Sequence, residues 1–121
     1  MTDARILRPD EADEYDTEER CFILEMSNAA SDEALSIARA RVEPGVTTQL
    51  HTLSVHEVYV IEEGNGLMSV GDLAPFIIGP GDTVSISKHT PQCVQNPGDD
   101  DLVFLCICTP RFSHKCYTSL E

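Results

Sequence analysis

Short runs of β-forming residues follow one another along most of the chain, and turn signals separate them at intervals of roughly ten residues. The runs are rich in Val, Ile, Phe and Thr, and several alternate apolar and polar residues, as strands with one buried face do. They read CFILEM, LSIARARVE, HEVYVIEE, GLMSVG, PFIIG, DTVSIS, QCVQN and DLVFLCICT. No segment has a convincing amphipathic helical pattern, so the sequence predicts an all-β sandwich or barrel.

Glycines mark several of the predicted reversals. Gly64 and Gly66, in EEGNG, stand where two strands must turn back, and turns of this kind often need a positive φ. The segment PGD at 80–82 places Pro and Gly in a tight turn before the next run. These positions therefore predict chain reversals with backbone conformations that glycine adopts most easily.

The length of the chain allows one folded domain with a single core, because 121 residues are too few for two. Residues 1–20 carry eight acidic residues and few large apolar ones. The pattern changes at Cys21, where the β-forming runs begin. We therefore predict an acidic N-terminal extension over residues 1–20, which lies on the domain or hangs free, and one domain over residues 21–121.

The charge of the chain excludes several partners. Eight Lys and Arg residues stand against twenty-one acids, giving a net charge of -13, whereas nucleic acids and anionic membranes attract clustered positive charge. No apolar stretch has the length of a signal peptide or approaches the ~18 residues of a membrane helix. The sequence predicts a cytoplasmic protein whose partners are small molecules.

Cysteine usage indicates neither a disulfide framework nor a zinc ribbon. The five cysteines are odd in number and form no CxxC pair. Cys106 and Cys108 are two residues apart in LVFLCICT, so on a strand they share one face. We interpret them as small core residues, with a reactive or metal-bound thiol as the alternative.

One stretch combines ionisable residues with turn glycines at a specific spacing. From Gly45, five residues lead to His51, Leu53 follows two positions later, Glu57 comes after three more residues, and six residues then lead to Gly64. This spacing resembles the first motif of the cupin superfamily, G-x5-H-x-H-x3,4-E-x6-G, with leucine in place of the second histidine.

A second stretch resembles the second motif of the same superfamily, G-x5-P-x-G-x2-H-x3-N. Here the positions are filled by Gly81, Ser87, His89, Gln92 and Asn96. The spacing holds, while Pro, Gly and His are replaced by Ser, His and Gln. The resemblance covers about residues 35–110, and it is similar to a subgroup of short cupins with H-x-L in the first motif and glutamine at the end of the second.

The resemblance implies a double-stranded β-helix, or jelly-roll, barrel with His51, Glu57 and Gln92 converging in its mouth. Their imidazole, carboxylate and amide oxygen suit a divalent transition metal, namely Mn, Fe, Co, Ni or Zn. Three protein ligands leave positions open for water and substrate, as catalysis requires. We expect His51 and Glu57 to be catalytic as well, by holding or moving a proton.

Other polar residues near the motifs have two interpretations each. His56 is adjacent to Glu57 and points to the opposite face of a regular strand, but a bulge would bring it to the metal. His89 replaces a turn glycine and is expected to be structural. Tyr59 shares the face of Glu57 and either binds substrate or fills the core. Arg39 and Arg41 share a face, which we expect to be the outer one, paired with surface acids.

Three functions are compatible with the sequence. The first is a metal-dependent cupin enzyme of oxygenase, isomerase or lyase type acting on a small polar organic molecule. The second is a metal-free epimerase or dehydratase with His51 as general base and Glu57 as its partner. The third is a non-catalytic module that binds a small ligand, because Leu53 makes the pocket wall more apolar. An exposed edge strand favours a homodimer in each case.

Overall fold

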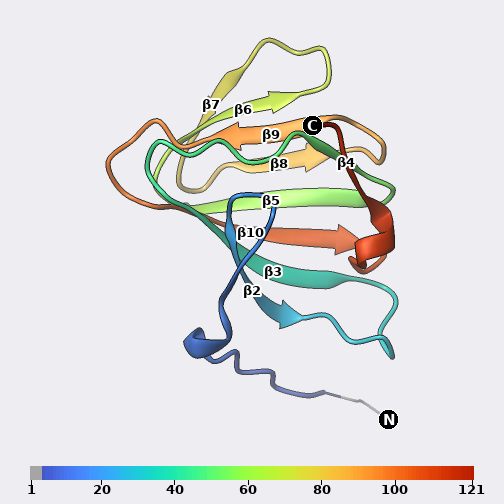
Figure 1. The fold of residues 1–121 in the computed structure, drawn as a ribbon. Coiled ribbons are helices and arrows are strands. Elements are labelled where there is room, and N and C mark those ends of the chain that lie inside the picture. Colours follow the sequence, from blue (N-terminus) through green and yellow to red (C-terminus); the bar gives the residue numbers. More distant parts are fainter. Residues whose placement is uncertain (1–3) are drawn as a thin grey trace.

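Two antiparallel sheets pack face to face in the structure, a computed structural model that describes residues 4–121 (Figure 1). One sheet has six strands in the order β1-β2-β3-β10-β5-β8, and the other has five in the order β11-β4-β9-β6-β7. The elements are η1 (Glu11–Asp13), β1 (Tyr15–Asp16), β2 (Phe22–Ser27), β3 (Ser36–Val42), β4 (His51–Leu53), β5 (His56–Glu63), β6 (Gly66–Val70), β7 (Phe76–Ile78), β8 (Thr83–Ile86), β9 (Gln92–Gln95), β10 (Leu102–Thr109), η2 (His114–Cys116) and β11 (Tyr117–Ser119).

The all-β prediction is confirmed, and each of the eight β-forming runs contains a strand. Alternation places one face of each run between the sheets, where Phe104, Ile61 and Met68 are among the largest fully buried side chains. The strands β1, β4 and β11 are short and were not predicted from the runs. Within residues 4–121, both helices are single 3₁₀ turns, so neither has the length to cross a membrane.

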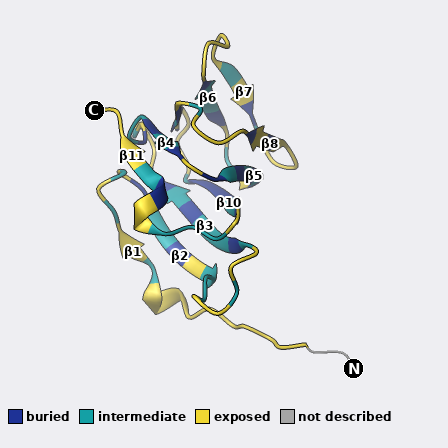
Figure 2. Cartoon of the chain, turned by 90° about the vertical axis from the view of Figure 1, so that its right-hand side faces the viewer, coloured by how far each residue is buried: buried dark blue, intermediate teal, exposed yellow. Residues whose placement is uncertain are grey.

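Residues 15–16 of the N-terminal extension form β1, the edge strand of the six-stranded sheet, and η1 precedes it. The first three residues of the extension are outside the described part of the chain. In Figure 1 the blue segment rises from η1 and turns back into β2, and Figure 2 shows η1 exposed on the surface. Arg39 pairs with Glu11 and Glu14, and Arg41 with Glu14 and Asp101. The prediction that Arg39 and Arg41 face outward and pair with acids is confirmed.

Two different structural requirements explain which residues occupy the turns. Gly64 has φ +78° and Gly81 has φ +90°, as the turn signals predict, and His89 occupies the same left-handed region at φ 65°. The expectation is wrong for Gly66, which does not have a positive φ. A Cβ at Gly66 would lie 2.9 Å from Cγ2 of Val94, so this position needs glycine for space in the core.

Substitution of Gly64 by alanine is expected to destabilise the protein more than the same substitution at Gly45. Both residues have positive φ, but a Cβ at Gly64 would lie 2.5 Å from the Asp101 carbonyl oxygen, whereas Gly45 has open space around it. We expect Gly45→Ala to cost about 1–2 kcal/mol from backbone strain alone. Urea unfolding of both variants checks this; an equal loss would show that the close approach to Asp101 carries no cost.

Candidate functional site

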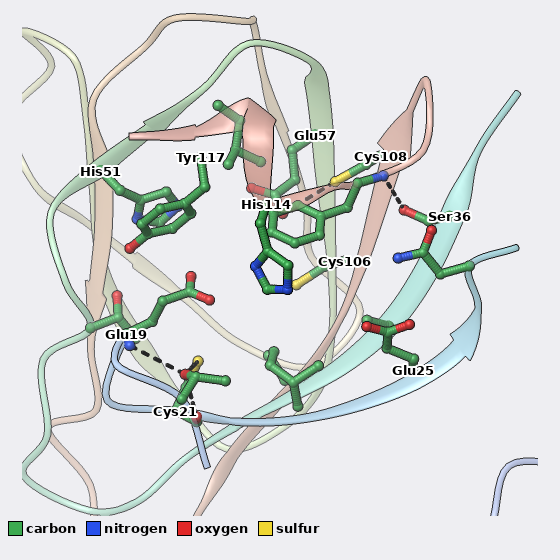
Figure 3. Close-up of a pocket in the computed structure, with 18 of the residues that line it drawn as sticks. Glu19, Cys21, Glu25, Ser36, His51, Glu57, Cys106, Cys108, His114 and Tyr117 are labelled. Atoms are coloured by element: carbon green, nitrogen blue, oxygen red, sulfur yellow. Dashed lines mark hydrogen bonds between the residues drawn. The ribbon is translucent and has the colours of Figure 1, made fainter. Parts of the chain in front are cut away.

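A cavity of about 420 Å³ opens between the two sheets at the end where the N-terminal segment crosses. Its wall combines side chains from β2, β3, β4, β5 and β10 with residues of the N-terminal segment and the C-terminal tail. Figure 3 shows His51, Glu57, Glu19 and Tyr117 around it. The size suits a small organic molecule, because ligand pockets typically enclose about 300–1,000 Å³.

His51 lies on β4 with its ring fixed by two contacts. Its Nδ1 lies 2.7 Å from the Gln49 carbonyl oxygen, and its ring stacks on Tyr117 with centroids 4.7 Å apart. Because a carbonyl only accepts, Nδ1 carries the proton and Nε2 is left as an acceptor. Burial lowers the pKa of His51 and so favours a neutral imidazole, while the hydrogen bond to Gln49 acts in the opposite direction and is the smaller effect. Leu53 shares the buried face, as strand alternation predicts.

Glu57 lies on β5 with an uncompensated carboxyl group. It is 6% exposed, and its Oε1 is buried without any hydrogen-bond partner. Its Oε2 accepts a long hydrogen bond from the Cys108 thiol at 3.7 Å. Burial raises the pKa of Glu57 to about 7. The Gln92 side chain acts in the opposite direction and lowers this pKa, although it makes no hydrogen bond to Oε1. A buried carboxyl of this kind holds a proton or awaits a ligand.

Gln92 and Tyr59 form a buried pair behind Glu57. The Tyr59 hydroxyl donates to Gln92 Oε1 at 2.7 Å, and the tyrosine ring stacks on Phe104 with centroids 4.4 Å apart. Gln92 lies opposite His51 in the β4–β9 register. Tyr59 lines the cavity on the same face as Glu57, but its hydroxyl is already engaged. A role for Tyr59 in substrate binding stays a prediction.

The residues of the motifs provide two uncommitted donor atoms for a metal, Nε2 of His51 and Oε1 of Glu57. The third predicted ligand, Gln92, uses its amide oxygen to accept the Tyr59 hydroxyl. Among the described residues, no group of three or more His, Cys, Asp or Glu side chains is arranged to hold a metal ion. Catalytic metal sites usually have three protein ligands, one more than the two free donor atoms found here, and ligation by His51, Glu57 and Gln92 stays a prediction.

The alternative role for His56 finds no support in its contacts. Its Nε2 lies 3.1 Å from the Ser85 hydroxyl in an exposed hydrogen bond, and its side chain does not line the cavity. It therefore points to the outer face of β5, as regular alternation predicts.

Several residues of the cavity wall were not identified from the sequence as parts of a site. Cys106 and Cys108 share one face, as predicted, and pack in the core, but both also line the cavity. Burial raises the pKa of both thiols, so they are protonated. Glu19 comes from the N-terminal segment and His114 from the C-terminal tail. Neither belongs to a motif, so no sequence signal pointed to them.

Comparison with known proteins identifies the family. A family model described as a cupin domain matches residues 38–108, more than half of the chain. The chain belongs to the cupin domain family. An uncharacterized protein of Methanocaldococcus jannaschii is 39% identical to this cupin over 87 residues, which are 71% of this chain and 69% of that protein.

Solved structures share the fold of this cupin at low sequence identity. Oxalate decarboxylase from Bacillus subtilis superposes with a TM-score of 0.79 and 20% identity over 99% of this chain, which spans 33% of that chain. Pac13, described as a nucleoside dehydratase and known from Streptomyces, gives a TM-score of 0.76 and 12% identity over 94% of this chain and 90% of its own. These likenesses support the jelly-roll barrel predicted from the motifs.

Proposed function

We propose that this cupin is an enzyme that moves protons on a small polar organic molecule without a resident metal. The observation that carries the proposal is the buried Oε1 of Glu57, which has no partner in a cavity shared with a neutral imidazole. Buried ionisable groups with displaced pKa values in a cavity are typical of proton-transfer sites. Pac13 and oxalate decarboxylase are described as enzymes on this fold, which supports an enzymatic role.

The two groups have complementary roles. The Gln49 carbonyl holds His51 with Nε2 unprotonated, so His51 is the general base. Glu57 is protonated over much of the range below pH 7 and is the general acid. In a dehydration, Nε2 takes a proton from carbon, a carbon–carbon double bond forms, and the leaving hydroxyl departs as water with the Glu57 proton. In an epimerisation the same base and acid act on opposite faces of one carbon.

A second candidate function is the metal-dependent enzyme. The observation that favours it is that His51 Nε2 and Glu57 Oε1 are both free donors on one cavity. Its third ligand would be Gln92 after release of the Tyr59 hydroxyl, with Mn, Fe, Co, Ni or Zn as the ion.

A cytoplasmic location and a homodimer also stay predictions from the sequence.

Chelation separates these functions. Wild-type protein is dialysed against EDTA, its metal content is measured by mass spectrometry, and turnover of a panel of hydroxy acids, sugars, nucleosides and amino alcohols is followed by NMR. We expect turnover to be unchanged after chelation, because the proposed acid and base are side chains. Loss of turnover that a divalent metal restores would establish the metal-dependent function instead. Panel members that bind without turnover would indicate a ligand-binding module.

A further inference from the structure

The N-terminal segment contributes an ionisable side chain to the cavity. Glu19 lies between β1 and β2, and Figure 3 shows its carboxyl group directed into the cavity below the stacked rings of His51 and Tyr117. Burial raises the pKa of Glu19 to about 7, as it does for Glu57. The extension therefore adds a carboxyl group with a raised pKa to the cavity wall, as β5 does with Glu57.

The backbone holds Glu19 in this position through specific contacts. The Glu19 amide donates to the Thr17 hydroxyl at 3.2 Å, and that hydroxyl donates to the Cys21 carbonyl at 2.7 Å. The Glu19 carbonyl accepts from the Gln49 amide at 3.0 Å. Gln49 is also the residue whose carbonyl orients His51. The segment and the proposed base therefore share one anchor.

Arg20 shows that this turn carries backbone strain. It has φ 67°, a conformation that residues with a Cβ rarely adopt. Its side chain points away from the cavity, donating to the Thr47 carbonyl and pairing with Glu121, each at 2.8 Å. The left-handed conformation of Arg20 thus directs its guanidinium away from the cavity, while the side chain of the preceding residue, Glu19, points into the cavity.

Apart from its two histidines, the ionisable Asp, Glu, Lys and Arg residues of the cavity wall are all acidic. Within residues 4–121, no lysine or arginine side chain lines the cavity. Arg111 donates to the side-chain oxygen of Asn28, a residue of the wall, at 2.8 Å, and does not itself line the cavity. Aromatic rings face the same space and favour a cation over their π-face. The acidic side chains that line the cavity are Asp16, Glu18, Glu19, Glu25 and Glu57, and the aromatic ones include Tyr59, Phe104, Phe112 and Tyr117.

We propose that the cavity binds an organic cation, a protonated amine or amidine, and that Glu19 is the residue of the N-terminal segment that selects for it. A bound cation favours the ionised form of Glu57, whose unpartnered Oε1 then accepts an N–H from the ligand, and Glu19 provides a further acceptor on the same cavity. A carboxylate or phosphate ligand would meet several acids in the wall and no guanidinium or ammonium group to pair with. This inference names the class of ligand for the site described under the proposed function, and it rests on that proposed function.

Three probes that share a phenyl ring and carry a positive, a neutral and a negative polar group test the ligand class: benzylammonium, benzyl alcohol and benzoate. Binding is followed by amide chemical shifts at fixed ionic strength, with the shifts expected around His51 and Tyr117. We expect benzylammonium to bind at least about ten times more tightly than benzyl alcohol, because charge-assisted hydrogen bonds are the stronger ones. Benzoate is expected to bind more weakly than the alcohol.

Matched variants locate the selectivity. Glu19→Gln is expected to weaken benzylammonium binding about ten-fold. Glu62→Gln makes the same charge change at the exposed end of β5 and is expected to leave binding unchanged. Glu19→Asp keeps the charge and is expected to retain the preference over benzyl alcohol. Amide spectra of each variant establish that the fold is intact before affinities are compared.

Four results would overturn the inference. These are no benzylammonium binding, benzoate binding as tightly as benzylammonium, equal effects of Glu19→Gln and Glu62→Gln, and tight stoichiometric Zn²⁺ binding that depends on Glu19. The proposed function is tested separately by turnover after chelation. Chelator-resistant turnover of a neutral or anionic substrate would contradict the ligand class alone, whereas amine binding without any turnover would contradict the proton-transfer function alone.

Discussion

Replacing Glu57 by glutamine is expected to make the protein more stable at pH 8, by up to about 3 kcal/mol, and to change its stability little at pH 4. Burial raises the pKa of Glu57 from 4.5 to about 7. Below pH 4.5 the carboxyl is protonated in both the native and the unfolded chain. Between pH 4.5 and 7 the unfolded chain releases the proton first, so the free energy of unfolding falls as the pH rises. Glutamine has no proton to release and removes this fall.

Urea unfolding of wild type and Glu57→Gln at pH 4, 6 and 8 measures the effect. Glu62→Gln, at the exposed end of β5, is the control for net charge, because the chain carries -13 and repels itself increasingly above pH 4. The pKa of Glu19 is raised in the same direction and that of His51 is lowered, so the slope that remains in Glu57→Gln contains a falling contribution from Glu19 and a rising one from His51. Equal pH slopes in wild type and Glu57→Gln would show that Glu57 is solvated or compensated.

Replacing His51 by glutamine is expected to lower turnover by about 10²–10⁴-fold, the contribution of a positioned general base. Nε2 is the acceptor nitrogen of His51, a residue that lines the cavity, and glutamine cannot take up a proton in its place. The free energy of unfolding is expected to change by less than the loss in turnover corresponds to, because β4 keeps its pairing with β9 and β11.

His56→Gln is the matched control for this experiment. Each histidine is the first residue of a strand, and the two are five residues apart, but His56 hydrogen-bonds to Ser85 on the outer face. We expect full turnover in His56→Gln. A loss as large as that in His51→Gln would mean that the variants act through folding, and unchanged turnover in His51→Gln would remove the proposed base.

The fold was predictable from the sequence because its signals are local. Alternation in the β-forming runs fixes which side chains face the core, and it places Glu57, Tyr59 and Ile61 on one buried face. The motif spacing carried the same information for His51 and Leu53. Gly64 and His89 marked turns that need left-handed backbone.

The composition of the cavity wall was less predictable because it depends on contacts between distant segments. Glu19 reaches the site through a strained turn at Arg20 and through its link to Gln49, and the charge pattern of residues 1–20 indicated only an acidic extension. Likewise, the sequence predicted that the amide oxygen of Gln92 is a metal ligand. It gave no sign that this oxygen accepts a hydrogen bond from the Tyr59 hydroxyl, because the two residues are 33 positions apart in the chain.

The proposed proton transfer requires that Glu57 is a buried carboxyl that exchanges its proton near neutral pH. Titration of ¹³C-labelled glutamate side chains by NMR measures this directly, with Glu57→Gln to assign the resonance. We predict a carboxyl carbon with a pKa of about 7 that is absent from the variant. A resonance assigned to Glu57 that titrates at the ordinary glutamate value of 4.5 would contradict the account.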